Sequence, residues 1–331
     1  NSFPVLKRLL DHKVIALEQE LSEKYKPKLI RCVRLHPNYQ HDSALQELVE
    51  TLKSASKQRE IVLSYFNLAT ATKQIKVSDL KTKSNATSTQ IKILIDKEVF
   101  EEYHYQTDRI QFQDSEDDAS IELNSYQKTA LKEIDGLFEA QNIVLLHGVT
   151  SSGKTEIYVK KIESILAEGK QALYLVPEIA LTSQLVQRLQ KYFGNQIAVY
   201  HSRYSQNERV EVWNHVLNQS ENARVVIGAR SSVFLPFCNL GLIIIDEEHE
   251  QSYKQFDPSP RYHARDTAIV LAALFKSKTL LGSATPSLES FYNATKETKY
   301  GYVVLNKRFN NVLMPEIELV DLTDKHKRKR M

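Results

Sequence analysis

The feature that most restricts the folds open to this sequence is a glycine-containing segment between an apolar run and an amphipathic run. The run NIVLLH leads directly into GVTSSGKT, Gly148–Thr155, and TEIYVKKIESILAEG follows. This segment matches G-x-x-x-x-G-K-[ST] in the strand-then-helix context that a phosphate-binding P-loop requires. Backbone N–H groups, the helix N-terminus and Lys154 would hold the phosphates, while Thr155 would bind Mg²⁺. The predicted nucleotide-binding residues here are Gly148, Val149, Thr150, Ser151, Ser152, Gly153, Lys154 and Thr155.

After residue 123, apolar runs of strand length alternate with amphipathic runs of helix length. The expected strands are NIVLLH, QALYLVP, IAVYH, ARVVIG, LGLIIID and KTLLGS. Continuous apolar strands separated by helices predict an α/β fold with a parallel sheet covered by helices. Ligands of such sheets bind beyond the carboxyl ends of the strands, and the polar motifs of this sequence all fall there.

A second polar motif ends the apolar strand in LIIIDEEH, Leu242–His249. The strand delivers Asp246 and Glu247 to its carboxyl end, where buried acids need a cation or water as partner. An acidic pair at a strand end is by itself more often a helix cap or a solvated loop, but a P-loop in the same chain favours a hydrolytic site. We expect Asp246 to hold Mg²⁺ and Glu247 to accept the proton of the water attacking the γ-phosphate. Lys154, Asp246 and Glu247 are therefore the predicted catalytic residues.

Two weaker signals gain weight from the P-loop. GSATP, Gly282–Pro286, follows another strand, and its hydroxyls Ser283 and Thr285 are expected, with His249, to couple the phosphate site to a neighbouring surface. Alone, this segment would be only a turn. Gln127, in LNSYQ, carries an amide that can form two complementary hydrogen bonds with an adenine edge. A lone glutamine would otherwise be uninformative.

Residues 42–114 show a different pattern, in which short helices lead into an alternating stretch. The order of three helices and a β-hairpin around Thr107–Asp108 predicts a winged helix, with Thr87–Lys97 as its recognition helix. Winged helices contact DNA or serve as protein-interaction modules, and no dense basic face decides between these roles here. We expect Gln90 and Lys92 to face outward, and Ile91, Ile93 and Leu94 to face inward.

The remaining boundaries follow from an internal similarity and a change in composition. VLKRLLDHKVIALEQEL near the start weakly resembles IKILIDKEVFEEYHY, which predicts a first, truncated winged-helix unit at about 1–41 with its hairpin at Lys26–Leu35. The acidic stretch SEDDAS marks a linker at 115–122. Residues 123–331 would then form a nucleotide-binding lobe and the start of another lobe.

Composition excludes several classes of protein. No apolar run approaches the roughly 18 residues of a membrane span, and the first residues lack a signal-peptide layout, so a cytoplasmic protein is expected. The two cysteines, Cys32 and Cys238, form no CxxC pair, which argues against a disulfide framework or a zinc site. A net charge of +3 permits nucleic-acid binding without indicating it. The initial Asn1 and the final run KHKRKR suggest a fragment of a longer protein.

The order of the motifs resembles one known family. GVTSSGKTE, LVPEIALTSQ, YHS, VVIGARSSVFLPF, DEEHEQSYKQ with RYHARD, and GSATPSLES closely resemble the bacterial replication-restart helicase family PriA, or primosomal protein N′, of helicase superfamily 2. The resemblance covers about Asn124–Asp321 and implies a RecA-like first lobe with Gln127 as an adenine sensor. It also implies 3′-to-5′ DNA unwinding that restarts replication at stalled or abandoned forks by primosome assembly. The implied partners are forked and single-stranded DNA, primosome proteins and single-stranded-DNA-binding protein, and a nucleoid-associated monomer is expected.

The same resemblance suggests where DNA binds. The loops Pro177–Thr182 and Gly228–Ser232 are expected to grip single-stranded DNA through phosphate contacts. Ser252–Asp266 resembles an aromatic-rich loop that couples DNA to hydrolysis, with rings stacked on bases and cations on the backbone. The alternative is that some of these aromatic residues belong to the core. The predicted DNA contacts are Pro177, Thr182, Arg230, Ser231, Tyr253, Phe256, Tyr262 and Arg265.

The sequence also departs from the family pattern. Members begin with a domain that captures a nascent 3′ end and continue into a second lobe with paired-cysteine zinc sites and an arginine finger; neither is present in this sequence. Zinc is therefore expected only in the missing half, and this chain alone is expected to bind ATP and Mg²⁺ but to hydrolyse ATP poorly and not to unwind DNA. One alternative is a fork-DNA-binding scaffold that binds nucleotide without turnover. A small-molecule kinase is disfavoured by the DExH and SAT motifs.

Overall fold

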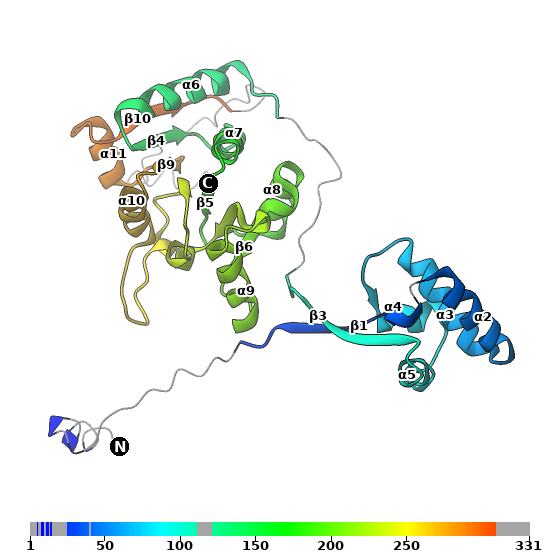
Figure 1. The fold of residues 1–331 in the computed structure, drawn as a ribbon. Helices are drawn as coiled ribbons and strands as arrows, with labels where there is room; N and C mark the ends of the chain where they lie inside the picture. Colours follow the sequence, from blue (N-terminus) through cyan, green and yellow to red (C-terminus); the bar gives the residue numbers. More distant parts are fainter. Residues whose placement is uncertain are drawn as a thin grey trace, which may run out of the picture. The chain divides into compact units, whose positions relative to one another are not determined.

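The computed structural model describes residues 25–39, 41–110 and 121–308, together with residues 5, 8, 9, 11, 12 and 14 (Figure 1). The chain divides into two compact units, residues 1–109 and 110–331. Most of the segment that suggested a first winged-helix unit, nearly all of the expected linker at 115–122, and the basic run after residue 324 lie outside the described residues.

The first unit is a helical cluster packed on a small antiparallel sheet. Its core joins the three helices that follow one another in the sequence to the last strand, through Ile61, Leu80, Ile91, Leu94 and Phe100. Within single helices the buried residues lie three or four positions apart, as Val77, Leu80 and Ser84 do, so each helix buries one face. The elements are β1 Lys28–Leu35, η1 Pro37–Tyr39, α2 Asp42–Thr51, η2 Leu52–Ser54, α3 Ser56–Ala69, β2 Ile75–Lys76, α4 Val77–Ser84, α5 Ser88–Asp96 and β3 Phe100–Thr107.

The strands of this sheet correct two predictions. Lys26–Leu35 does not form a hairpin of its own, and Thr107–Asp108 is not the turn of one. Instead β1 pairs antiparallel with β3 from Lys28 opposite Thr107 to Leu35 opposite Phe100, and β2 pairs with the other edge of β1. A strand needs a partner for its backbone groups, and here that partner lies about 70 residues away in sequence, where local alternation cannot reveal it. Residues 28–35 therefore belong to the same winged helix as β3.

Helix α5 matches the predicted recognition helix. Thr87 caps it by accepting a hydrogen bond from Gln90 N, and the Gln90 side chain accepts one from Thr87 N. Gln90 is thus half-buried in a capping box and does not point freely outward. Lys92 is exposed as expected, whereas Ile93 is 38% exposed and not a core residue.

The second unit is built on a seven-stranded sheet in the order β10-β4-β9-β8-β5-β7-β6, in which every pair is parallel. The six expected strands are all present, and β10 adds an edge strand that the sequence did not reveal. The strands are β4 Ile143–Gly148, β5 Gln171–Leu175, β6 Ile197–Tyr200, β7 Val225–Gly228, β8 Leu240–Asp246, β9 Lys278–Ser283 and β10 Gly301–Leu305.

Helices cover both faces of this sheet because the strands are apolar on both sides. Val144 and Leu146 pack with α6, α7 and α8, whereas Leu145 packs on the opposite face with α9, α10 and α11. The helices are α6 Ser125–Ala140, α7 Lys154–Ala167, α8 Ser183–Phe193, α9 Gln206–Leu217, α10 Ala264–Phe275 and α11 Leu288–Thr295, with short 3-10 turns η3 Gly194–Gln196, η4 Glu221–Ala223, η5 Arg230–Phe234 and η6 Gln251–Tyr253. The predicted α/β class is confirmed. Among the described helices none has the length and apolar character to cross a membrane.

Candidate nucleotide-binding site

The P-loop connects β4 to α7 in a conformation that two left-handed residues make possible. Ser151 has φ 62° and Gly153 has φ 85°, and Gly153 forms the N-cap of α7. The positive φ favours glycine there, and a Cβ atom on Gly153 would lie 2.0 Å from Gln127 Nε2 and would have to displace that amide. The Ser152 hydroxyl is buried and has no hydrogen-bond partner among the residues that the structure describes, as expected of a group that binds a ligand.

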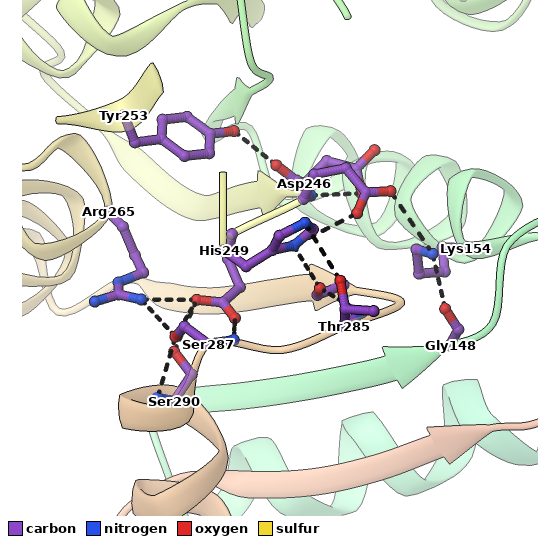
Figure 2. A network of polar contacts seen from close by, with 12 residues as sticks. Gly148, Lys154, Asp246, His249, Tyr253, Arg265, Thr285, Ser287 and Ser290 are labelled. Carbon is purple, nitrogen blue, oxygen red and sulfur yellow. Dashed lines mark hydrogen bonds and ion pairs between the residues drawn. The ribbon is translucent and has the colours of Figure 1, made fainter. Parts of the chain in front are cut away.

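Lys154 lies at the centre of this site. Its Nζ donates to the Gly148 carbonyl at 2.9 Å and lies 3.9 Å from Glu247 Oε1, which brings the P-loop and the DEEH motif together (Figure 2). A phosphate would replace the Gly148 carbonyl as the partner of this ammonium group. The structure thus juxtaposes the side chains that the sequence marked as catalytic.

Asp246, the last residue of β8, is held by two buried tyrosines. Tyr158 donates to Oδ1 at 3.0 Å and Tyr174 donates to Oδ2 at 3.2 Å, while Glu247 N donates to Oδ1 at 3.1 Å. Burial raises the pKa of Asp246 and the negative charge of Glu247 raises it further, against the opposing influence of Lys154 and the tyrosine hydrogen bonds. Burial also raises the pKa of Tyr158 and Tyr174 well above the ordinary value, so both remain neutral donors.

Glu247 turns toward the nucleotide cavity because its backbone is left-handed, with φ 46°. Its carboxylate lies between Lys154 and His249, whose Nδ1 is 3.8 Å from Oε2. His249 in turn contacts Ser283 Oγ at 2.8 Å and Thr285 Oγ1 at 3.3 Å (Figure 2). The three residues expected to couple the site to its surroundings are therefore joined to one another by hydrogen bonds, and His249 also lies near the Glu247 carboxylate.

Gln127 is buried and lies against the P-loop. Its Oε1 accepts from Asn124 N at 2.9 Å in a capping box of α6, and its Nε2 donates to the Gly153 carbonyl at 3.3 Å. These two hydrogen bonds use one acceptor position of Oε1 and one N–H of Nε2, and a side-chain amide has a second of each. The contact of Gln127 with adenine stays a prediction.

One cavity of about 510 Å³ contains the nucleotide motifs. Arg188, which no motif marked, comes into its wall from α8. No group of three or more His, Cys, Asp and Glu side chains among the described residues could hold a metal ion. Mg²⁺ bound with a nucleotide needs only one or two protein ligands, since phosphates and water supply the rest. The lining residues are Thr150, Ser151, Ser152, Gly153, Lys154, Thr155, Glu156, Arg188, Asp246 and Glu247.

Sequence reasoning missed the role of Glu248, the third residue of DEEH. This carboxylate is fully buried and accepts from Arg265 Nη1 at 2.9 Å, from Ser287 N and Oγ, and from Ser290 Oγ (Figure 2). The cluster ties the turn after β8 to the starts of α10 and α11. Arg265 also donates to Ser287 Oγ at 2.6 Å, and its side chain is only 11% exposed.

The predicted DNA contacts separate into two groups. Tyr253 is 1% exposed and donates to the Asp246 carbonyl at 2.7 Å, Arg265 is held by Glu248, and Pro177 is buried at the end of β5. Side chains that are buried and engaged inside the fold present little surface for stacking on bases or holding a backbone, and their contact with DNA stays a prediction. The residues that remain accessible are Thr182, Arg230, Ser231, Phe256 and Tyr262.

The accessible residues lie in three segments, namely the start of α8 (Thr182), η5 (Arg230 and Ser231) and the loop after η6 (Phe256 and Tyr262). Phe256, 68% exposed, sits in the loop closed by the bridge between Lys254 and His263, whereas Tyr262 is half-buried and packs edge-on against Phe234 at 4.8 Å. Thr182 caps α8 and lines a groove of about 820 Å³. The other groove residues are Glu178, Ile179, Leu181, Ser183, Val186, Gln187, Gln190, Val199, His201, Ser202, Arg203 and Tyr204.

Both units are similar in sequence to known proteins. Residues 124–293 match the family model of DEAD/DEAH box helicases, and residues 30–107 match that of the winged helix domain of PriA helicase from Bacteroidota. The replication restart protein PriA of Bacillus subtilis is 38% identical over 94% of this chain and 38% of the relative, and that of Haemophilus influenzae is 41% identical over 86% and 40%. The protein of the same name from Rickettsia felis is 45% identical over 61% of this chain and 30% of the relative.

The chain thus spans 30–40% of the length of these relatives. The resemblance to replication-restart helicases that the motifs indicated is confirmed, and the RecA-like sheet and the winged helix agree with the two family models. This chain belongs to the DEAD/DEAH box helicase family.

Proposed function

We propose that this chain is the ATP-binding lobe and winged-helix region of a 3′-to-5′ DNA helicase that restarts replication at stalled or abandoned forks. The observation that carries the proposal is the meeting of Lys154, Asp246 and Glu247 in one cavity at the carboxyl ends of β4 and β8. Lys154 supplies the cation for the β- and γ-phosphates, and Glu247 receives the proton of the attacking water.

The residues also suit Mg²⁺. Thr155 and Asp246 line the same cavity, and burial raises the pKa of Asp246, so a cation nearby would stabilise its ionised form. When bound, Mg²⁺ neutralises charge on the phosphates. Tyr158 and Tyr174 orient the Asp246 carboxylate by occupying one position on each of its oxygens.

On the DNA side, Thr182, Arg230 and Ser231 contact the backbone of single-stranded DNA, and Phe256 stacks on a base. Support comes from their exposure at the carboxyl edge of the sheet or in the loop after β8. The winged helix contributes to recognition of forked DNA, with Lys92 on the accessible face of α5. Primosome proteins and single-stranded-DNA-binding protein are the proposed protein partners of the monomeric whole protein.

By itself the chain binds ATP and turns it over slowly, without unwinding DNA. Helicase turnover depends on charge stabilisation of the γ-phosphate and on closure of the protein around ATP. The relatives are more than twice as long as this chain, and we propose that these two contributions come from the part of the relatives that this chain does not cover.

The test compares ATP hydrolysis by the full-length protein with and without single-stranded DNA. DNA should raise the rate of the wild type, Lys154→Ala should abolish that rise, and Glu247→Gln should lower the rate by about 10²–10⁴-fold while retaining ATP binding. Lys170→Ala, an exchange of a lysine far from the cavity on the loop before β5, serves as the control. A full-length protein that binds ATP but whose rate does not respond to DNA would instead be a scaffold that binds nucleotide without turnover.

A further inference from the structure

Arg188 is a charged residue of the nucleotide cavity that the function proposed above leaves unused. It comes from α8, outside the P-loop and the DEEH motif, and it lines the cavity beside Thr155, Glu156 and Glu247. The described lining residues comprise two cations, Lys154 and Arg188, and three carboxylates, Glu156, Asp246 and Glu247. The formal charge of the lining side chains is therefore −1, which would repel a polyphosphate. A bound cation such as Mg²⁺ would offset this repulsion.

The partner of Arg188 is a residue of the phosphate-binding helix itself. Arg188 Nη2 donates to Oε1 of Glu156, which follows Thr155 in the first turn of α7. The other oxygen of Glu156, Oε2, is buried and has no hydrogen-bond partner in the part of the chain that the structure describes. The guanidinium group thus contacts one carboxylate oxygen, whereas its planar donors can bind two oxygens at once. The ion pair is therefore weaker than a bidentate one would be.

Phosphate oxygens offer a better partner than this carboxylate. Arginine forms paired charge-assisted hydrogen bonds with phosphate, and the Arg188 side chain is 47% exposed, which leaves it room to rearrange. Arg188 lines the same cavity as Thr155 and Glu247, the residues proposed to bind Mg²⁺ and to accept the proton of the attacking water. A guanidinium group in this wall can therefore pair with the terminal phosphate of a triphosphate, which a diphosphate lacks.

Helix α8 also forms the wall of the larger groove. Thr182, its N-cap, and Ser183, Val186 and Gln187 line the groove, while Arg188 lines the nucleotide cavity. Thr182 and Arg188 are six residues apart, about 9 Å along the helix axis. One rigid element thus carries both a residue for which we propose a DNA contact and a residue at the phosphates.

We propose that Arg188 is a γ-phosphate ligand supplied by α8, that Glu156 holds it when nucleotide is absent, and that α8 couples single-stranded DNA in the groove to the grip on ATP. This inference rests on the nucleotide and DNA binding proposed above. It adds a sensor arginine within the same lobe as the P-loop.

The experiment measures dissociation constants of this chain for fluorescent analogues of ADP and of a non-hydrolysable ATP, both with Mg²⁺. Arg188→Ala should weaken the triphosphate about 10- to 100-fold, as expected for the loss of a hydrogen-bonded charge, and ADP by less than about threefold. Arg188→Lys should restore part of the difference, and Glu156→Gln should tighten the triphosphate by releasing the arginine. Lys191→Ala, which removes an exposed cation of the same helix that lines neither cavity, is the matched control.

Equal weakening of both nucleotides by Arg188→Ala would overturn the inference, because it would mean that Arg188 only neutralises Glu156. No weakening of either would overturn it as well. The function proposed above fails separately, if the wild type binds neither nucleotide or if Lys154→Ala binds both as the wild type does.

The coupling is tested by adding a saturating oligo(dT). DNA should change the affinity of the wild type for the triphosphate, and by thermodynamic reciprocity the triphosphate should change the affinity for DNA by the same factor. Arg188→Ala should remove this change. A change of the same size in wild type and variant would show that the coupling runs through another element.

Discussion

The P-loop and the segment Ser252–Asp266 both carry conspicuous polar residues in a loop, yet their local sequences determine side-chain positions to different degrees. In the P-loop six of the eight expected residues, Thr150 to Thr155, line the cavity, and Gly148 contributes the carbonyl that holds Lys154. In the other segment Phe256 is exposed, but Tyr253 and Arg265 support the interior. Side-chain positions in a short motif whose backbone conformation is set by its own residues can be predicted from the local sequence. In an aromatic and basic loop the same side chains can either face solvent or pack in the core, so the local sequence does not predict their positions.

The largest effect that we expect is a loss of folding stability on replacement of the largely buried Arg265. Arg265→Ala leaves Glu248 buried without its cation, and removal of one partner from a buried ion pair costs about 3–5 kcal/mol. For a unit of this size that corresponds to a fall of roughly 6–20 °C in the midpoint of thermal unfolding. Circular dichroism of this chain would measure it.

The control for this change is Arg261→Ala, which removes an exposed arginine from the same loop and should leave the midpoint nearly unchanged. The double variant Glu248→Gln/Arg265→Ala should recover part of the loss, because it removes the unpaired charge. If Arg265→Ala is as stable as Arg261→Ala, then Arg265 is free to contact DNA after all.

A smaller effect should separate the exposed residue of the same segment from its buried neighbours. Phe256→Ala should weaken binding of single-stranded DNA by the full-length protein by about 1–3 kcal/mol, the usual contribution of one stacked base, while the thermal midpoint stays within about 2 °C. Fluorescence anisotropy at fixed salt would measure the affinity. Phe291→Ala, an exchange of a partly exposed phenylalanine on α11, serves as control, and equal affinities for wild type and Phe256→Ala would exclude stacking at this position.

The smallest effect concerns pH and the nucleotide cavity. Burial raises the pKa of Asp246, so the folded state binds its proton more tightly than the unfolded state does. The stability associated with Asp246 is therefore present below the ordinary carboxyl pKa and is lost as pH rises toward the raised value. Asp246→Asn cannot ionise, so the midpoint of the variant minus that of the wild type should rise by a few degrees between about pH 4 and pH 7 in EDTA.

The exposed acid Asp257 provides the matched substitution, Asp257→Asn, whose difference from the wild type should stay flat over this range. A difference that falls with pH for Asp246→Asn would mean that the folded state favours the ionised carboxylate even without Mg²⁺.

Several parts of this protein could be predicted from local signals in its sequence. A glycine that must adopt a left-handed φ, a lysine one residue later and an apolar strand before them fix the P-loop, because backbone geometry and spacing leave few alternatives. The same holds for the continuous apolar strands, which predict a sheet covered on both faces, and for α5 with its cap at Thr87. In each case the interacting groups are separated by only a few residues.

Features that depend on contacts between residues distant in the chain became visible only in the folded structure. The pairing of β1 with β3 bridges about 70 residues, and β10 is recognisable as a strand only because it lies beside β4. Glu247 and Glu248 are neighbours of the same type, yet one faces the cavity and the other a buried arginine. Arg188 reaches the phosphate site from α8 for the same reason: packing brings separate elements together, and no spacing in the sequence records that contact.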